Sequence, residues 1–229
     1  MFQAIVFDLD GTLLDTLDDL TDSVNASLAH FSLPKVTKEN VRDSIGNGAR
    51  RLIEGVVKDG AAYPEFEELL AYYIPYYQAH CREKTAPYEG ILPMMQAAKK
   101  AGIKMAIVSN KGDGAVKTLS ELYFPGLVEA AVGERPGIRR KPVPDSVLEA
   151  MRLLDSAPEE TLYVGDSEVD YETAKNAGIS CMLVSWGYSD RPELEASNSL
   201  GIFDTPAALL DGIIALMPEE EKGEASHAF

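Results

Sequence analysis

The chain has 229 residues, of which 45% are hydrophobic and 25% are charged, and its formal net charge is -16. This composition is typical of a globular protein, and no apolar stretch reaches the roughly 20 residues that a membrane span needs. The acidic surplus repels a polyanion, so nucleic acid is not an expected partner. The only two cysteines, Cys81 and Cys181, lack the spacing of a zinc or disulfide framework, which favours a cytoplasmic protein.

The first expected strand, residues 2–7, ends in the run Asp-Leu-Asp-Gly-Thr at residues 8–12. The carboxylates of Asp8 and Asp10 repel each other unless a cation lies between them, so the pair is a candidate divalent metal site. Open α/β folds bind their ligands at such a strand end, and Gly11 allows a tight turn there. The alternative interpretation is an ordinary acidic turn after a strand.

Helical spacing of apolar residues continues from residue 17 to residue 84, without a strand pattern. We therefore expect an all-helical domain at 16–85, inserted into a core domain formed by 1–15 and 86–229. The tyrosines at 72, 73, 76 and 77 recur at helical spacing, which predicts that they belong to the core of this insert.

A glycine loop, Ile-Gly-Asn-Gly-Ala-Arg-Arg-Leu, occupies residues 45–52 of the insert. The backbone N–H groups of Gly46, Asn47 and Gly48 are candidates for binding an anion at the start of a helix. Arg51 or its neighbour Arg50 would add positive charge for a carboxylate. The equally weighted alternative is a simple turn between two helices, with both arginines in solvent.

From residue 87 onward, apolar β-branched runs alternate with helical patterns, which is typical of a parallel sheet wound with helices. Together with the first strand, these runs predict a five-stranded, Rossmann-like α/β core, whereas the residues after Met217 resemble a frayed acidic tail. The further strands are expected at 104–109, 127–132, 161–164 and 181–184, and the helices at 93–101, 115–122, 144–154 and 171–177.

Polar groups end three of the later expected strands or follow them closely. Ser109 and Asn110 offer a hydroxyl and backbone N–H groups for phosphate oxygens. Lys141 offers a compact positive charge, and Asp166 and Asp170 offer two further carboxylates. Because parallel strands end at one edge of a sheet, we expect these residues to converge with the first motif.

Taken in order, the four motifs resemble those of the haloacid dehalogenase-like hydrolases of the phosphatase kind, over residues 2–190. The resemblance implies that the helical insert is a cap domain. It further implies that Asp8 is a nucleophile that becomes an aspartyl phosphate, and that Asp10 is the general acid and base. Lys141 would neutralise charge during phosphoryl transfer.

The resemblance also implies a Mg²⁺ ion as cofactor, held by the Asp8 carboxylate, the backbone carbonyl of Asp10 and Asp166. Thr12 and Ser109, with the Asn110 amide, would bind the phosphate. Asp170 would lie behind the metal, orienting Lys141 or a metal-bound water.

Within the family, the glycine loop is most similar to that of the phosphoglycolate phosphatases. This similarity implies a Mg²⁺-dependent phosphatase acting on a small phosphorylated metabolite, as a monomer or homodimer. The loop at 134–140 is unusually basic for that group and would steer a more highly charged ester. Two alternatives stay open, namely a sugar-phosphate mutase of the β-phosphoglucomutase kind and a non-catalytic phospho-ligand-binding regulatory protein.

Overall fold

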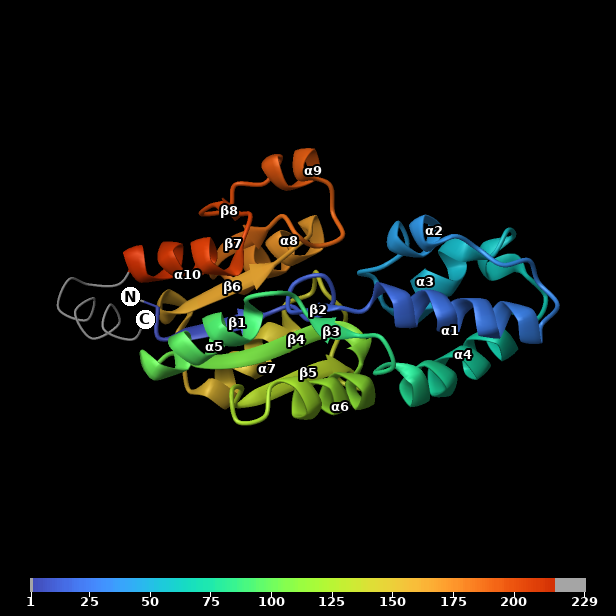
Figure 1. The fold of residues 1–229 in the computed structure, drawn as a ribbon, viewed down its shortest axis with the longest axis horizontal. Helices are drawn as coiled ribbons and strands as arrows, with labels where there is room; N and C mark the ends of the chain where they lie inside the picture. Colours follow the sequence, from blue (N-terminus) through green and yellow to red (C-terminus); the bar gives the residue numbers. More distant parts are fainter. Residues whose placement is uncertain (1, 217–229) are drawn as a thin grey trace.

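The computed structural model describes residues 2–216, so the predicted acidic tail lies outside the described part. A six-stranded parallel sheet in the order β5-β4-β1-β6-β7-β8 forms the centre of the fold (Figure 1). This sheet confirms the predicted Rossmann-like α/β core. Its strands are β1 (Ala4–Phe7), β4 (Lys104–Gly112), β5 (Ala130–Glu134), β6 (Thr161–Gly165), β7 (Ser180–Val184) and β8 (Ile202–Phe203).

Helices cover both faces of the sheet, and β1 shows how the two layers arise. Successive side chains of a strand point to opposite faces, so Ile5 and Phe7 pack in one apolar cluster and Ala4 and Val6 in another. All four side chains are fully buried, which explains the uninterrupted apolar run in the sequence. The first cluster includes α5 (Ile91–Lys100), α6 (Asp113–Tyr123) and α10 (Pro206–Ala215), and the second includes α7 (Asp145–Leu154) and α8 (Glu168–Ala177).

The predicted core elements need three corrections. The expectation of five strands is wrong, because β8 adds a sixth; it has two residues and pairs only with β7, so it is too short to show an alternating pattern. The strand expected at 127–132 is β5, displaced to Ala130–Glu134. Helices α9 (Arg191–Glu195) and α10 were not predicted, whereas the four predicted core helices are confirmed with ends shifted by three residues or fewer.

Residues 17–80 form a separate group of helices beyond the carboxyl end of β1, and we call this group the helical insert (Figure 1). Helices α1 and α4 pack against each other, and α3 contacts α4 as well. Within residues 2–216, no helix has both the length and the apolar character to cross a membrane. The insert contains α1 (Leu17–His30), α2 (Lys38–Arg42), α3 (Gly48–Val56), a 3₁₀ turn (Gly60–Ala62) and α4 (Phe66–His80).

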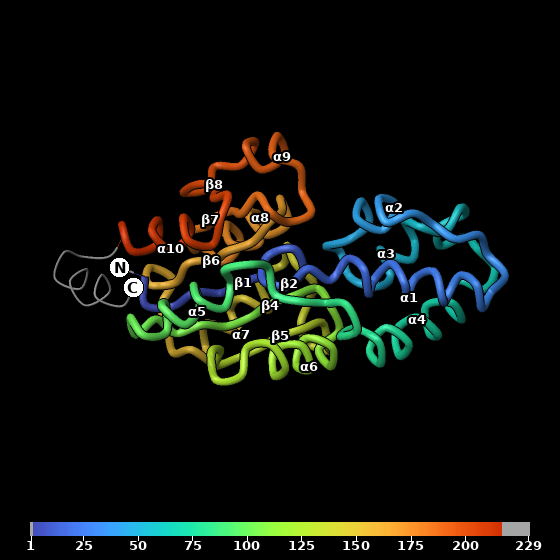
Figure 2. Tube along the Cα trace, viewed as in Figure 1, coloured from blue at the N-terminus to red at the C-terminus, as the bar shows by residue number. Residues whose placement is uncertain are grey.

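Two chain segments connect the helical insert to the sheet, and they run side by side (Figure 2). Strand β2 (Leu14–Asp15) pairs antiparallel with β3 (Ala86–Pro87). The buried carboxylate of Asp19, in the first turn of α1, accepts hydrogen bonds from the backbone N–H groups of Lys84 and Thr85. Both connections are therefore fastened to each other where the insert begins.

Candidate active site

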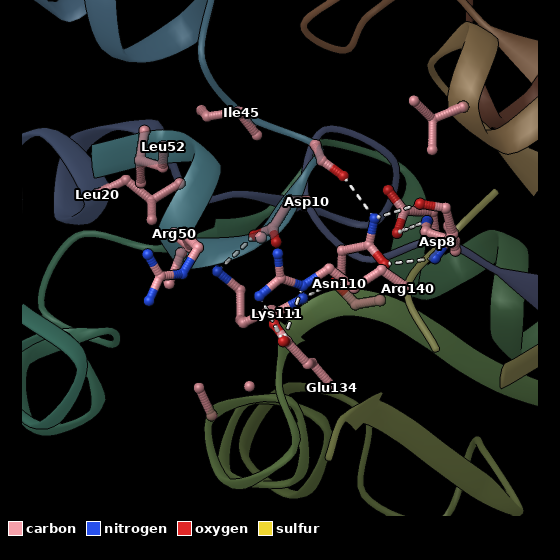
Figure 3. Close-up of a pocket in the computed structure, with 18 of the residues that line it drawn as sticks. Asp8, Asp10, Leu20, Ile45, Arg50, Leu52, Asn110, Lys111, Glu134 and Arg140 are labelled. Atoms are coloured by element: carbon pink, nitrogen blue, oxygen red, sulfur yellow. Dashed lines mark hydrogen bonds and ion pairs between the residues drawn. The ribbon is translucent and has the colours of Figure 1, made fainter. Parts of the chain in front are cut away.

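A cavity of about 910 Å³ lies between the carboxyl ends of the core strands and the helical insert (Figure 3). Residues that are far apart in the sequence meet there, as the alternation of strands and helices predicts. The predicted site residues that line it are Asp8, Asp10, Gly46, Gly48, Ser109, Asn110, Lys141 and Asp166. The predicted site residues outside its lining are Thr12, Asn47, Arg51 and Asp170.

Lys141 lies between two carboxylates at the floor of this cavity. Its Nζ is 2.7 Å from Oδ1 of Asp8 and 2.7 Å from Oδ1 of Asp170, and it donates a 3.0 Å hydrogen bond to the Tyr163 hydroxyl. Burial disfavours the ammonium, but the charges of Asp170 and Asp8 outweigh this effect and raise the pKa of Lys141. Lys141 therefore keeps its positive charge next to the Asp8 carboxylate.

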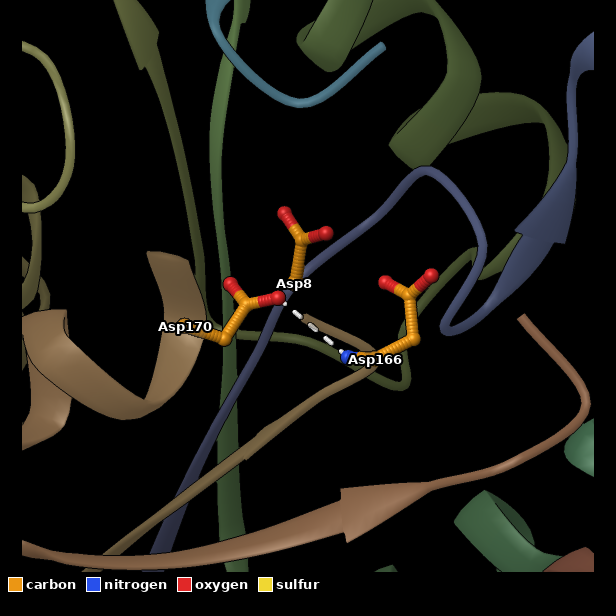
Figure 4. Close-up of side chains that lie close together, drawn as sticks. All are labelled: Asp8, Asp166 and Asp170. Atoms are coloured by element: carbon orange, nitrogen blue, oxygen red, sulfur yellow. Dashed lines mark hydrogen bonds between the residues drawn. The ribbon is translucent and has the colours of Figure 1, made fainter. Parts of the chain in front are cut away.

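Asp8, Asp166 and Asp170 form a buried acidic cluster (Figure 4). Each can offer one carboxylate oxygen within 4.8 Å of the oxygens of the other two. Burial raises the pKa of Asp8 well above its usual range, although Lys141 acts in the opposite direction. Burial, reinforced by the charge of Asp170, raises the pKa of Asp166 to about 7. The fold thus holds these carboxyl groups where ionisation is costly without a compensating cation.

The hydrogen bonds divide the three acids into two kinds. Oδ1 of Asp170 accepts from Lys141 and Tyr163, while its Oδ2 accepts from Ser167 and from the backbone of Asp166, so each oxygen accepts two hydrogen bonds. Lys141 occupies only Oδ1 of Asp8, and no hydrogen bond within residues 2–216 reaches Oδ2. Each oxygen of Asp166 accepts only one hydrogen bond within the described residues, which leaves a lone pair on each for a cation. An oxygen-only donor set of this kind fits Mg²⁺, with Asp8 and Asp166 as the candidate ligands.

Asp166 is held tightly by its surroundings. The Thr12 hydroxyl donates to Oδ1 at 3.1 Å, and the backbone N–H of Tyr188 donates to Oδ2 at 2.7 Å. Two glycines leave room for the carboxylate, because a Cβ at Gly11 or Gly187 would overlap it. The structure therefore places Thr12 as a hydrogen-bond donor to Asp166, away from the cavity wall.

The Asp10 carboxylate points away from the acidic cluster. Its Oδ1 accepts from the Thr16 hydroxyl at 2.6 Å and lies 2.9 Å from Nζ of Lys111, which in turn donates to the Tyr77 hydroxyl at 2.6 Å. Only the Asp10 backbone carbonyl, named in the prediction, is therefore a candidate metal ligand from this residue. Sequence reasoning missed Lys111 and Tyr77 as site residues, although Lys111 directly follows a recognised motif.

The side chain of Asn110 joins the core to the helical insert. Its Oδ1 accepts from the backbone N–H of Lys141, and its Nδ2 donates to the carbonyl of Lys141 and, at 2.8 Å, to that of Gly46. The Ser109 hydroxyl accepts a hydrogen bond from the backbone N–H of Lys111. Ser109 lies at the cavity floor and is 5% exposed. Asn110 thus leaves its backbone amide, rather than its side chain, for a phosphate.

The glycine loop lines the cavity with both of its glycines and with Arg50, besides apolar residues of the same loop. Gly46 and Gly48 have φ angles of +101° and +81°, a left-handed conformation that favours glycine. Arg50 lines the cavity, whereas Arg51 points to solvent, pairs with Glu54 and has a side chain 66% exposed. Of the two arginines considered from the sequence, the structure places Arg50 at the site.

The arginines of the basic loop at 134–140 are each paired with a carboxylate. Arg135 contacts Asp113 at 2.9 Å, and Arg140 contacts Glu134 at 2.6 Å. Arg139 lies outside the cavity lining, where Asp145 holds it through two side-chain hydrogen bonds. The loop therefore presents much less free positive charge than its sequence indicates.

Residues 5–184 match the family model described as haloacid dehalogenase-like hydrolase. The chain belongs to this family. Three-quarters or more of the chain is thus accounted for by the family model, including Asp8, Ser109, Lys141 and Asp166, which the structure brings to one cavity. The resemblance inferred from the four motifs is therefore confirmed.

Several members of the haloacid dehalogenase-like hydrolases are similar along almost their whole length. A phosphoglycolate phosphatase of Mesorhizobium japonicum is 37% identical over 208 residues, covering 87% of this chain and 91% of that protein. The N-acetylmuramic acid 6-phosphate phosphatase of Pseudomonas aeruginosa is 32% identical over 213 residues, covering 91% and 93%. CbbY from Rhodobacter sphaeroides, solved in complex with phosphate, superimposes with a TM-score of 0.78 at 26% identity, covering 93% and 99%.

Proposed function

We propose that this hydrolase cleaves small phosphate monoesters with the aid of Mg²⁺, through an aspartyl phosphate on Asp8. The observation that carries the proposal is the Asp8 carboxylate at the cavity floor, with one oxygen 2.7 Å from the Lys141 ammonium and the other facing no hydrogen-bond donor within residues 2–216. Two relatives named above are phosphatases of phosphate monoesters, which supports the same reaction.

Asp8 and Asp166 would hold the Mg²⁺ ion, together with the backbone carbonyl of Asp10. When bound, Mg²⁺ supplies positive charge that offsets the repulsion between a carboxylate and an anionic ester. Lys141 supplies further positive charge from the chain itself, and Asp170 and Tyr163 fix its position. Positioning and charge stabilisation of this kind account for most catalysis in phosphoryl transfer.

The reaction follows in two steps. In the first, a carboxylate oxygen of Asp8 forms a bond to phosphorus, the bond from phosphorus to the ester oxygen breaks, and Asp10 donates a proton to the departing alcohol. In the second, Asp10 takes a proton from water as the water oxygen attacks phosphorus, and the bond between the Asp8 oxygen and phosphorus breaks, which releases inorganic phosphate and restores Asp8. Asp10 lines the same cavity as Asp8, so one carboxyl group can serve both proton transfers.

We further propose that residues 16–85 act as a cap domain over a core formed by 1–15 and 86–229. The hydrogen bond from Asn110 to Gly46 and that from Lys111 to Tyr77 support this arrangement, because both join the insert to the core at the cavity. Closure of the cap would exclude water from the intermediate until Asp10 activates it. The two buried free cysteines, Cys81 and Cys181, fit a cytoplasmic location.

Hydrolysis of p-nitrophenyl phosphate tests the proposal, measured with Mg²⁺ and with a chelator. We expect turnover only with Mg²⁺, and a phosphorylated protein that can be trapped by acid quench. Asp8→Asn should lower turnover by several orders of magnitude and abolish trapping, since the amide is a poor nucleophile. The exposed Asp211 of α10 provides the control, because Asp211→Asn changes the same charge away from the cavity. Normal turnover in chelator or in Asp8→Asn would refute the proposal.

Product analysis with β-glucose 1-phosphate and other phosphate esters separates the two alternatives. A sugar-phosphate mutase returns the phosphoryl group to a sugar, so it would convert β-glucose 1-phosphate to an isomer without stoichiometric release of inorganic phosphate. A regulatory protein without catalytic activity would bind phosphate esters and leave them intact. Release of one inorganic phosphate per ester consumed is the outcome that the proposed phosphatase requires.

A further inference from the structure

The cavity has two unlike sides. Its floor, at the strand ends, carries the carboxylates and Lys141, whereas the helical insert contributes mainly apolar side chains. Figure 3 shows Leu20 and Leu52 side by side on the insert, with Ile45 nearby, across the cavity from Asp8. Leu20 and Leu52 are only 4% exposed, whereas Ile74 of α4 also lines the cavity and is 47% exposed, so Ile74 presents apolar surface to the cavity.

The cations that line the cavity away from the acidic cluster already have anionic partners. Lys111 lies 2.9 Å from Asp10, and Arg140 lies 2.6 Å from Glu134. Arg135 lies 2.9 Å from Asp113. A second anionic group on a substrate would have to displace one of these carboxylates.

The two arginines that the insert contributes to the cavity are held in the same way. Arg42 donates to the carbonyl of Tyr188 at 2.8 Å and pairs with Asp190. Arg50 pairs with Glu67 at 2.7 Å, and its guanidinium lies 5.2 Å from the centre of the Phe66 ring, which holds it against α4. The insert therefore offers the cavity apolar surface without an uncommitted cation.

The cavity is also lined by acidic side chains without a cationic partner in the described part of the chain. Asp43, Glu168 and Glu193 line the cavity, and none of the three forms an ion pair within residues 2–216. All three side chains are exposed, so solvent screens their repulsion of an anionic leaving group, but none of them offers such a group a partner. The volume of about 910 Å³ lies near the upper end of the range of about 300–1,000 Å³ for ligand pockets, and greatly exceeds what a two-carbon alcohol fills.

We propose that the preferred substrate is a phosphate monoester of an uncharged alcohol, whose carbon-rich part lies against Ile74 on the apolar side of the cavity. This inference rests on the proposed phosphatase function and adds the class of the leaving group. The phosphoryl group binds at Asp8 and Lys141, the alcohol oxygen faces Asp10, and the rest of the alcohol extends toward the insert. A second phosphate or a carboxylate on that alcohol lowers kcat/KM.

Two matched pairs of esters test the inference, each differing only in a carboxylate replaced by a hydroxymethyl group. The pairs are 2-phosphoglycolate with 2-hydroxyethyl phosphate, and 6-phosphogluconate with glucitol 6-phosphate. With the purified full chain and Mg²⁺, we expect the uncharged ester of each pair to have a kcat/KM at least about tenfold higher. The larger pair should also exceed the smaller pair, because it fills more of the apolar side.

A variant of Ile74 tests whether the side of the cavity on the insert decides this preference. Ile74→Lys places an uncommitted ammonium there and should lower the ratio of uncharged to charged kcat/KM at least about tenfold in both pairs. Leu148→Lys is the matched control, since Leu148 is 48% exposed on α7 and lies outside the cavity lining. Its ratios should equal those of the unmodified chain.

Ile74→Ala provides a second variant without a new charge. It removes apolar contact, so it should lower kcat/KM for glucitol 6-phosphate more than for 2-hydroxyethyl phosphate. Ratios near or below one in the unmodified chain, or ratios unchanged in both Ile74 variants, overturn the inference while the phosphatase function stands. No Mg²⁺-dependent turnover of any of the four esters or of p-nitrophenyl phosphate contradicts the phosphatase function, and the inference with it.

Discussion

Nζ of Lys111 lies 2.9 Å from Oδ1 of Asp10, in a contact where both side chains are almost completely buried. Tyr77 of the insert accepts a hydrogen bond from the same ammonium. Breaking a buried pair by removing one partner leaves the other charge uncompensated, which is strongly destabilising. The arrangement therefore links the residue proposed as acid and base to both the core and the insert.

Lys111→Met should lower kcat by about 10²-fold, because Asp10 loses the partner that holds its carboxylate toward the cavity. The Mg²⁺ concentration that gives half-maximal activity should stay unchanged, since Lys111 does not contact the acidic cluster. Lys117→Met is the control: Lys117 is 53% exposed and pairs with Asp113 on the same side of the core. Equal kinetics in the two variants would contradict the role given to Lys111.

Gly187→Ala should weaken Mg²⁺ binding at least about tenfold, because the new Cβ would overlap the Asp166 carboxylate and displace a proposed metal ligand. Titration of activity with Mg²⁺ measures the effect. Gly212→Ala creates a comparable clash, 2.5 Å from the Phe203 ring, far from the cavity. That variant should lose stability and keep its Mg²⁺ dependence. A Gly187→Ala protein with unchanged Mg²⁺ dependence would show that Asp166 does not hold the metal.

Gly46→Ala and Gly48→Ala form a matched pair in the glycine loop. Both positions have positive φ, so alanine costs about 1–2 kcal/mol at each. Only at Gly48 would the new Cβ meet the core, at 3.1 Å from the Asn110 carbonyl and 3.2 Å from Arg140. We therefore expect similar losses of thermal stability but a kcat/KM several-fold lower for Gly48→Ala, measured with p-nitrophenyl phosphate. The reverse order would mean that the contact between loop and core is unimportant.

The stability of the metal-free protein should fall as the pH rises from about 4 to about 7. Burial raises the pKa of Asp166 to about 7 from an ordinary value of 3.8, so in this window the folded chain binds a proton that the unfolded chain has released. The free energy of unfolding therefore decreases with pH, and Mg²⁺ should reduce that slope by favouring the ionised form. Urea unfolding at pH 5 and pH 7.5, with Mg²⁺ and with chelator, measures both effects. Asp166→Asn should lose the Mg²⁺ effect.

The central part of the site follows from local sequence. Asp8, Ser109 and Asp166 each lie at or just after the end of an apolar run, and the parallel arrangement of those runs brings them together without further information. Lys141 follows its strand after a longer loop and was expected at the same edge, while its role in phosphoryl transfer came from the resemblance to a family. The convergence of strand ends is a topological property, which explains why it could be predicted.

Other features depend on contacts between distant segments. Lys111 and Tyr77 meet only because the end of α4 packs next to the end of β4, and nothing in either local sequence shows that the lysine is buried. Arg50 and Arg51 are neighbours on α3, where consecutive side chains point about 100° apart. The rotation of that helix relative to the core decides which arginine faces the cavity, and this rotation cannot be read from the sequence.

The two-residue ladder between β2 and β3 has a consequence for how such proteins diversify. Its paired strands place Asp15 directly opposite Ala86, a separation that a tight hairpin turn can bridge. The helices between them can therefore be shortened, enlarged or exchanged for another module without altering a single pairing in the parallel sheet. A replacement module would still have to supply partners for Lys111 and Asn110, which bond to Tyr77 and Gly46 of the present insert.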